Sequence, residues 1–257
     1  MKNLELFLLI GILMVACDGN VTQHSDPNAG IKKDASGKII EGEFHSFRND
    51  GTLYSTAIYK DYKKNGKAII FYKDGVTPKN VLFFHNDKKE GVQKYYYESG
   101  KLYRKTNYLR GRKDGVETKY RENGMVYAVI EYKDGQPGKG LKEYLTNGKL
   151  KKKYPHIIID EIDHLGFDGS FTLKVYMSDK SKRVEYFEGL LTDGRFFNNK
   201  CNRMVPVKNG VLTISFQLAP GHFIIRDLHL IAKLKTRLNN YYIDTKTYHM
   251  AIENKLR

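Results

Sequence analysis

One short pattern occurs five times in the first half of the chain, with a period of 24 to 25 residues. Each unit opens with a glycine, continues through a short aromatic-rich segment and reaches a second glycine. The opening glycines are Gly42, Gly66, Gly91, Gly115 and Gly140, and the second glycines are Gly51, Gly75, Gly100, Gly124 and Gly148. Self-similarity this regular is typical of a repeat array, in which each unit stacks on its neighbours.

The second glycine of each unit lies in a turn dipeptide such as Asp50-Gly51, flanked by Tyr, Phe, Ile and Val. Because glycine readily adopts the positive φ that a tight hairpin turn needs, each unit predicts one β-hairpin. The polar, glycine-ended segments between the units predict the links from one hairpin to the next. These links are Lys64-Asn65-Gly66, Lys89-Glu90-Gly91 and Lys113-Asp114-Gly115.

Aromatic residues recur at two positions of the unit. They are Phe47, Phe71, Tyr96, Tyr120 and Tyr144 after the first glycine, and Tyr59, Phe83, Tyr108 and Tyr132 after the second. One hairpin alone is marginally stable in water, so the hairpins must bury these rings together. We therefore expect the aromatic rows to form the core on one face of the array, with Lys and Arg on the other face.

The segments from Gly91 to Tyr103 and from Tyr108 to Gly115 resemble the bacterial variant of the MORN repeat, found in proteins of the YwqK-type antitoxin family. The resemblance covers residues 42 to about 154 and implies an array of MORN-like hairpins without a catalytic motif. The antitoxin label implies a role in neutralising a partner. Eukaryotic relatives of the repeat are associated with membrane and scaffold functions.

The N-terminus predicts export. An uninterrupted apolar run from Leu6 to Ala16 is short for a bilayer span and has the form of a secretory signal. The run ends in Leu-Met-Val-Ala-Cys17, which resembles a bacterial lipobox, so residues 1–16 are expected to be a lipoprotein signal peptide and Cys17 the lipidated residue. The polar residues that follow predict a flexible tether over 17–41. The expected location is the bacterial cell envelope, on the inner or outer membrane or at the cell surface.

From residue 155 onwards the repeat is replaced by longer alternating strands. Phe171, Leu173, Val175 and Met177 alternate with more polar residues, and Leu212 to Leu218 and Leu228 to Leu234 repeat this pattern. Asp-Gly, Asn-Gly and Pro-Gly turns separate the strands. Residues 155–257 therefore predict an antiparallel β-sandwich of immunoglobulin-like size, after a repeat array over 42–154. The whole protein is expected to be all-β.

The formal net charge of +15 is concentrated in the array, where residues 42–154 hold 25 Lys and Arg against 13 Asp and Glu. An exported cationic array favours an anionic surface (lipid headgroups, lipopolysaccharide or acidic glycans) or an envelope protein as partner, rather than nucleic acid. The alternative is that the charge only keeps an exposed sheet soluble. The densest cluster is a candidate contact with an anionic surface: Lys149, Lys151, Lys152 and Lys153.

No sequence motif for a nucleophile, a zinc protease, a nucleotide loop or a dithiol occurs, so neither catalysis nor a cofactor is expected. Asp163 and Asp168 leave a calcium site open as an alternative, although a solvated strand end is the simpler interpretation. If Cys17 carries lipid, Cys201 is the remaining thiol of the mature chain. It has no catalytic motif around it and is interpreted as an ordinary loop or strand cysteine.

Together these patterns predict a non-enzymatic exported lipoprotein that acts as a binding or scaffold module at the envelope through its repeat surface. The family label keeps a toxin-neutralising protein as an alternative. An envelope enzyme is a second alternative, which would require a compact polar pocket near Pro155, where the array meets the sandwich. The oligomeric state and the identity of the partner are not indicated by the sequence.

The lipidation hypothesis makes a direct prediction. Replacing Cys17 with Ala should leave the precursor unprocessed and should remove the label incorporated from a radioactive fatty acid, because the acyl chains would be attached through this residue. The wild-type chain, expressed in parallel, provides the positive control. A Cys17→Ala protein that still carries the fatty-acid label would contradict the hypothesis.

Overall fold

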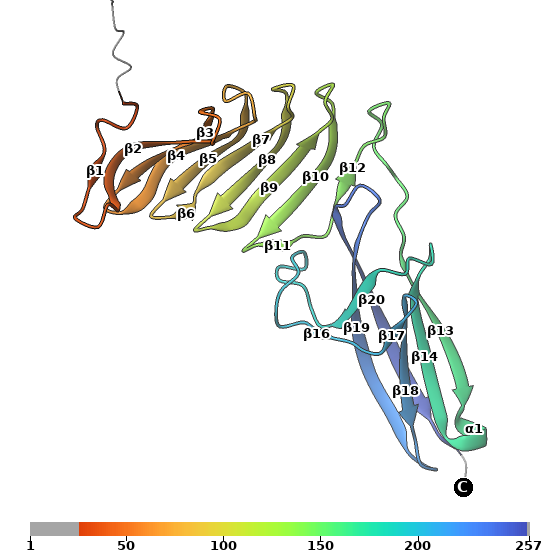
Figure 1. Ribbon diagram of the computed structural model, residues 1–257. Coiled ribbons are helices and arrows are strands. Elements are labelled where there is room, and N and C mark those ends of the chain that lie inside the picture. Colours follow the sequence, from red (N-terminus) through yellow and green to blue (C-terminus); the bar gives the residue numbers. More distant parts are fainter. Residues whose placement is uncertain (1–25, 256–257) are drawn as a thin grey trace, which may run out of the picture.

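The computed structural model describes residues 26–255, and the predicted signal peptide and Cys17 lie outside these residues. The first part of the described chain is one twelve-stranded antiparallel sheet, whose strands follow one another in chain order (Figure 1). Its strands are β1 Lys32–Lys33, β2 Ile39–Phe47, β3 Leu53–Lys60, β4 Lys63–Phe71, β5 Pro78–His85, β6 Lys88–Lys89, β7 Gly91–Tyr96, β8 Leu102–Leu109, β9 Arg112–Tyr120, β10 Val126–Lys133, β11 Gln136–Pro137 and β12 Lys142–Glu143. Two strands per repeat confirm the predicted hairpin array.

The first edge of the sheet begins inside the predicted tether. β1 pairs with β2, and the side-chain oxygen of Asn28 accepts a hydrogen bond of 2.8 Å from the backbone N–H of His45. Residues 28–41 therefore contribute to the array, and a tether over the full range 17–41 was wrong in its second half.

Turns of two kinds join the strands. The predicted turns at the second glycines are confirmed: the N–H of Gly51 donates to Arg48 O, and the same bond recurs in the later units. The predicted links at Lys64-Asn65-Gly66 and its equivalents were wrong, because those residues lie in or at the start of strands. The actual links are two-residue turns with positive φ at both residues, which suits a right-twisted hairpin. They are Asp61-Tyr62, Asn86-Asp87, Arg110-Gly111 and Asp134-Gly135.

Four of the five opening glycines have a different role from the one predicted: each lies across from an aromatic ring of the neighbouring strand. The register pairs are Gly42 with Tyr59, Gly66 with Phe84, Gly91 with Tyr108 and Gly115 with Tyr132. At Gly115, with φ of +93°, an added Cβ would lie 3.1 Å from the side chain of Asn107. A side chain at this position would therefore be both strained and crowded.

This pairing corrects one of the predicted aromatic positions. Phe84, rather than Phe83, is in phase with the other three rings and packs against the buried residues Ala57, Ala68 and Leu82. Phe83 is the neighbouring residue on the strand, so it points to the opposite face, where it is 40% exposed. The extra residue between Gly66 and Gly91 makes that spacing 25 rather than 24, and the sequence pattern alone placed the ring one position too early.

The core of the array is formed by short side chains and not by complete aromatic rows. We call the face that carries Ala57, Ala68 and Leu82 the inner face; its central row continues through buried Gln93, Thr106, Glu117 and Ile130. Of the nine predicted core rings, Tyr132 is buried, whereas Phe47 is 46% exposed. The prediction that complete aromatic rows form the core was wrong, because rings after the first glycines lie at the ends of their strands, beyond a β-bulge. These rings are Phe47, Phe71 and Tyr96.

The Gln93 side chain replaces backbone hydrogen bonds between β5 and β7, where the repeat is one residue longer. Its side chain is fully buried, accepts a bond of 2.9 Å from the N–H of Phe83 and donates one of 3.1 Å to Phe83 O. Regular strand pairing between β5 and β7 covers only Asn80 and Val81. The amide thus supplies the donor and the acceptor that the backbone of β7 does not provide at this point.

Side chains also connect each repeat to the next at one end of the sheet. The residue after the first strand of four units donates to a carbonyl one repeat later, at distances of 2.6 to 2.8 Å. The pairs are Arg48 with Phe71 O, Tyr72 with Tyr96 O, Tyr97 with Tyr120 O and Arg121 with Tyr144 O. These bonds fix the spacing of the loops along the array.

The second part of the chain confirms the predicted antiparallel β-sandwich. One four-stranded sheet has the order β13-β14-β18-β17 and the other the order β16-β15-β19-β20. The elements are β13 Ile157–His164, α1 Leu165–Asp168, β14 Ser170–Met177, β15 Val184–Glu188, β16 Asn202–Arg203, β17 Val207–Lys208, β18 Val211–Gln217, β19 Phe223–Lys235 and β20 Tyr241–Glu253. Leu173, Val175 and Met177 of one sheet and Leu228 and Leu230 of the other belong to a single buried core.

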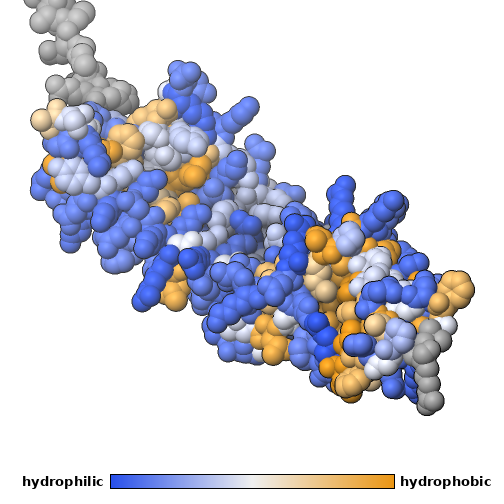
Figure 2. All heavy atoms as spheres, turned by 90° about the horizontal axis from the view of Figure 1, so that it is seen from below, coloured by the Kyte–Doolittle hydropathy of each residue, from blue (hydrophilic) through white to orange (hydrophobic). Residues whose placement is uncertain are grey.

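The sandwich follows the array at its C-terminal end, so that the molecule is elongated (Figure 1). The sandwich loop around residues 195–197 caps the last strands of the array: the N–H of Phe197 donates to Pro137 O, and the N–H of Lys139 donates to Arg195 O. Hydrophilic side chains predominate over the array, whereas hydrophobic side chains gather on the sandwich (Figure 2). This division agrees with the apolar core of the sandwich and the polar central row of the array.

The corrected core predicts unequal effects of two ring deletions. Tyr132→Ala should lower the free energy of unfolding by about 3–5 kcal/mol, because it leaves a cavity beside the buried Ile130. Phe47→Ala, which removes a half-exposed ring at the end of β2, should cost less than about 2 kcal/mol. Urea titration of both variants measures the difference, and equal losses would contradict this account of the core.

Candidate binding surface

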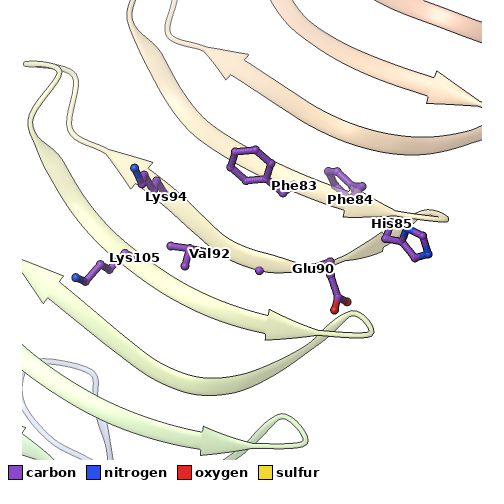
Figure 3. Close-up of a pocket in the computed structure, with 8 residues that line it drawn as sticks. Phe83, Phe84, His85, Glu90, Val92, Lys94 and Lys105 are labelled. Carbon is purple, nitrogen blue, oxygen red and sulfur yellow. The ribbon is translucent and has the colours of Figure 1, made fainter.

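The outer face of the array, opposite the central row, carries an open depression over β5, β7 and β8 (Figure 3). Its volume is about 750 Å³, and Phe83, Val92, Lys94 and Lys105 line it together with residues of the β5–β7 connection. The register places Lys94 beside Val81 on one side and directly opposite Lys105 on the other. Strand alternation therefore brings two cations and two apolar side chains onto one open surface.

The two lysines are a like-charge pair within the sheet. Among residues 26–255, neither Lys94 nor Lys105 has a carboxylate within ion-pair distance. Like charges directly opposite each other on neighbouring strands destabilise a sheet. Phe83 and Val92, which line the same depression, remain 40% and 43% exposed. This part of the face thus presents uncompensated positive charge beside apolar surface.

The inner face holds its charges in a closed network instead. The Glu117 carboxylate is 1% exposed, lies 2.6 Å from Lys113 Nζ and 3.7 Å from Lys119 Nζ, and accepts a bond of 2.9 Å from Thr106 Oγ1. Burial opposes ionisation of Glu117, but the lysines and Arg104 outweigh it and hold the pKa of this carboxyl below its usual value. Burial of the Lys119 ammonium outweighs the attraction of Glu117 and lowers the pKa of Lys119.

This network continues into the sandwich. Lys119 Nζ donates to Asn240 Oδ1 at 2.7 Å, and Asn240 Nδ2 donates to Glu143 Oε1 at 2.8 Å. Glu143 also accepts from Thr236 Oγ1 and pairs with Lys151 at 3.1 Å. With both of its oxygens occupied, Glu143 has a structural role, because it connects the end of the array to the β19–β20 hairpin.

The predicted lysine cluster does not lie on a face of the array. Lys149 is exposed in the loop after β12, and Lys151 pairs with Glu143. Lys152 and Lys153 are exposed and line a groove between the array and the sandwich. All four lysines line one open depression with Leu145 and Leu150, separate from the outer-face depression, and Lys151 also pairs with Glu143.

The remaining candidates have local structural partners. Asp163 and Asp168 each accept a backbone N–H bond beside α1, from Leu165 and from Ser170. Cys201 is buried among Phe187, Phe197 and other apolar side chains of the sandwich. Within the part of the chain that the structure describes, no group of three His, Cys, Asp or Glu residues is arranged to hold a metal ion, and no helix is long and apolar enough to cross a membrane.

Sequence reasoning missed the polar members of the central row. Phe44, Ala68, Gln93 and Glu117 occupy one repeat position, spaced 24 or 25 residues apart. Aligning the five units on their glycines would have revealed Gln93 and Glu117 at a position that elsewhere holds Phe44 or Ala68. The contact of Glu143 with Asn240 spans 97 positions and has no signal in the repeat.

The ion network predicts a pH-dependent effect of Glu117→Gln. The amide should still accept from Thr106 but would leave buried cations unpaired, so we expect a loss of about 3 kcal/mol near neutral pH. The folded pKa of Glu117 lies below the unperturbed value of 4.5, so its contribution is complete above about pH 4.5 and is lost as the pH falls through the folded pKa.

Chemical unfolding of both proteins at a series of pH values from neutral to acid tests this assignment. The difference in stability should narrow below about pH 4.5, because the unfolded wild-type chain takes up the Glu117 proton more readily than the folded one. Thr172→Val, at an exposed pair on the sandwich, serves as a control without a carboxylate change. A difference that stays constant with pH would argue against an ionised Glu117 in the folded array.

The family comparison agrees with these hairpins. The family described as MORN repeat variant matches residues 89–109 and 113–134, which contain β7–β8 and β9–β10. No curated protein matches the chain. Over these two hairpins the chain is similar to the MORN repeat variant, a repeat that is typical of binding modules rather than of catalytic domains.

Proposed function

We propose that the protein is an exported, lipid-anchored binding module of the bacterial cell envelope, which contacts an anionic surface through the outer face of its repeat array. The observation that carries the proposal is the uncompensated pair of Lys94 and Lys105 beside exposed Phe83 and Val92. A surface of this composition suits lipid headgroups, since cations attract the phosphates and apolar side chains enter the headgroup region. The proposed role is non-enzymatic.

The proposed anchor would keep the array close to the membrane. Ten residues lie between Cys17 and Asn28, where the first edge of the array begins, so the connection can span at most about 35–40 Å. Attachment at this distance raises the effective concentration of the array at the surface. Weak intrinsic affinity is therefore sufficient for contact, and a partner-neutralising role of the YwqK type would require a protein partner instead.

Co-sedimentation with vesicles tests the proposal. The chain from residue 18, which has no lipid, should pellet with vesicles containing phosphatidylglycerol at low salt and less at physiological salt, because exposed charges are screened beyond about 8–10 Å. Lys94→Gln/Lys105→Gln should reduce pelleting without loss of stability, since it removes a like-charge pair. Lys182→Gln/Lys208→Gln, which removes the same charge from the sandwich, is the matched control.

Two results would contradict the proposal. Failure of the wild-type chain to pellet at low salt would mean that the positive charge serves solubility and would favour a protein partner. An equal reduction in pelleting for the array variant and the sandwich variant would mean that vesicle binding depends on the total charge of the chain and not on the outer face of the array.

A further inference from the structure

A large concavity lies between the array and the sandwich, away from the outer-face depression. It has a volume of about 1100 Å³. One wall is the segment that follows the array, including Lys152 and Lys153, and the other is the tip of the β19–β20 hairpin, including Lys235 and Arg237. Concave sites between structural units are common places for ligands.

The charges of this groove are unbalanced. Its two carboxylates are engaged internally: Glu143 with Lys151, Thr236 and Asn240, and Asp179 with the N–H and hydroxyl of Ser181. Lys152, Lys153, Lys235 and Arg237 are exposed, and none of them has a carboxylate partner within residues 26–255. Four cations on two facing walls therefore remain available to a ligand.

The two walls are held together by side chains that bond to one another across the junction and are therefore not available to a ligand. Glu143 on the array side bonds to Thr236 and Asn240, which flank Arg237 in the opposite hairpin. Tyr154 stacks on Tyr242 with ring centroids 4.9 Å apart, and its hydroxyl accepts the N–H of Glu143. A groove whose walls are bonded together loses little conformational freedom when a ligand enters.

We propose that this groove binds an anionic saccharide chain whose carboxylate or phosphate groups pair with the cations of both walls. Because the groove carries several cations without carboxylate partners among the described residues, an anionic ligand matches it better than a neutral one. The volume of the groove is larger than one small anion needs, so the ligand should be a chain with several charged groups. Saccharide hydroxyls can still bond to two serines of the lining, because within residues 26–255 Ser178 Oγ accepts only the N–H of His156 and Ser181 Oγ donates only to Asp179, so each hydroxyl keeps one unused bonding role.

An acidic peptide fits the groove less well. A peptide would bring backbone amides that need partners, and strand addition requires an unpaired sheet edge. Strand β19 of the hairpin wall has no such edge, because it is paired with β15 on one side and with β20 on the other. Strand β20 is the outer strand of its sheet, so strand addition there is the form of peptide binding that poly-glutamate tests. This site is separate from the outer face of the array, so the inference does not depend on the proposed contact with lipid.

Calorimetric titration of the chain from residue 18 tests the assignment, because this chain contains every described element. The probes are oligogalacturonate for carboxylate, a phosphorylated oligomannoside for phosphate, neutral dextran and poly-glutamate. Oligogalacturonate or the phosphorylated oligomannoside should bind, with the stronger of the two identifying the charged group, whereas dextran should not. Lys152→Gln/Lys153→Gln and Lys235→Gln/Arg237→Gln should each weaken binding about tenfold, since each removes half of the charged contacts.

Lys94→Gln/Lys105→Gln is the matched control and should bind the saccharide as the wild type does, even if it fails to bind vesicles. All six substitutions are at exposed positions, and unchanged thermal unfolding will show that the variants fold. Equal weakening by the control pair would overturn the proposal, because it would mean that binding follows total charge. Poly-glutamate binding as tight as that of either saccharide, or no saccharide binding at low salt, would also overturn it.

Discussion

The stability of the array depends on one constraint: a single sheet must shield a buried row of its own side chains from water. Within residues 26–255, no second layer packs on the inner face over most of the array, so the rim of the same sheet must exclude water from Ala57, Ala68 and Leu82. The pairing of an opening glycine with an aromatic ring of the next strand supplies this rim in four consecutive units. Glycine suits all four positions because the backbone adopts positive φ, and at Gly42, Gly66 and Gly115 neighbouring atoms also crowd the space of a Cβ.

Towards the sandwich, the same row changes from apolar to charged residues. Glu117 lies at the repeat position that holds Phe44, Ala68 and Gln93 in the earlier units. Asn240 and Glu143 extend the contacts of Glu117 and Lys119 across the junction. Buried ion pairs contribute little net stability, but removing one partner is costly. The network therefore fixes how the last repeats meet the β19–β20 hairpin, and the junction groove takes its shape from that contact.

Two surfaces follow from this construction, and they differ in chemistry. The outer face combines Lys94 and Lys105 with exposed apolar residues and is open, which suits a flat partner such as a membrane. The junction groove is larger, has two walls that both carry cations, and also exposes Leu145 and Leu238, which suits an extended anionic chain. The two proposed contacts, with a saccharide and with a lipid surface, therefore lie at different points along the chain.

The sequence by itself determined the all-β class, the hairpin turns at the second glycines and the alternating strands of the sandwich. These depend on local requirements, namely positive φ in a turn and a period of two in a strand. Only the tertiary structure decided that Phe84 and not Phe83 faces inward, because a one-residue shift in register reverses every side chain. It also decided that Lys152 and Lys153 face the β19–β20 hairpin, since the contact of Glu143 with Asn240 joins residues that no repeat or local pattern relates.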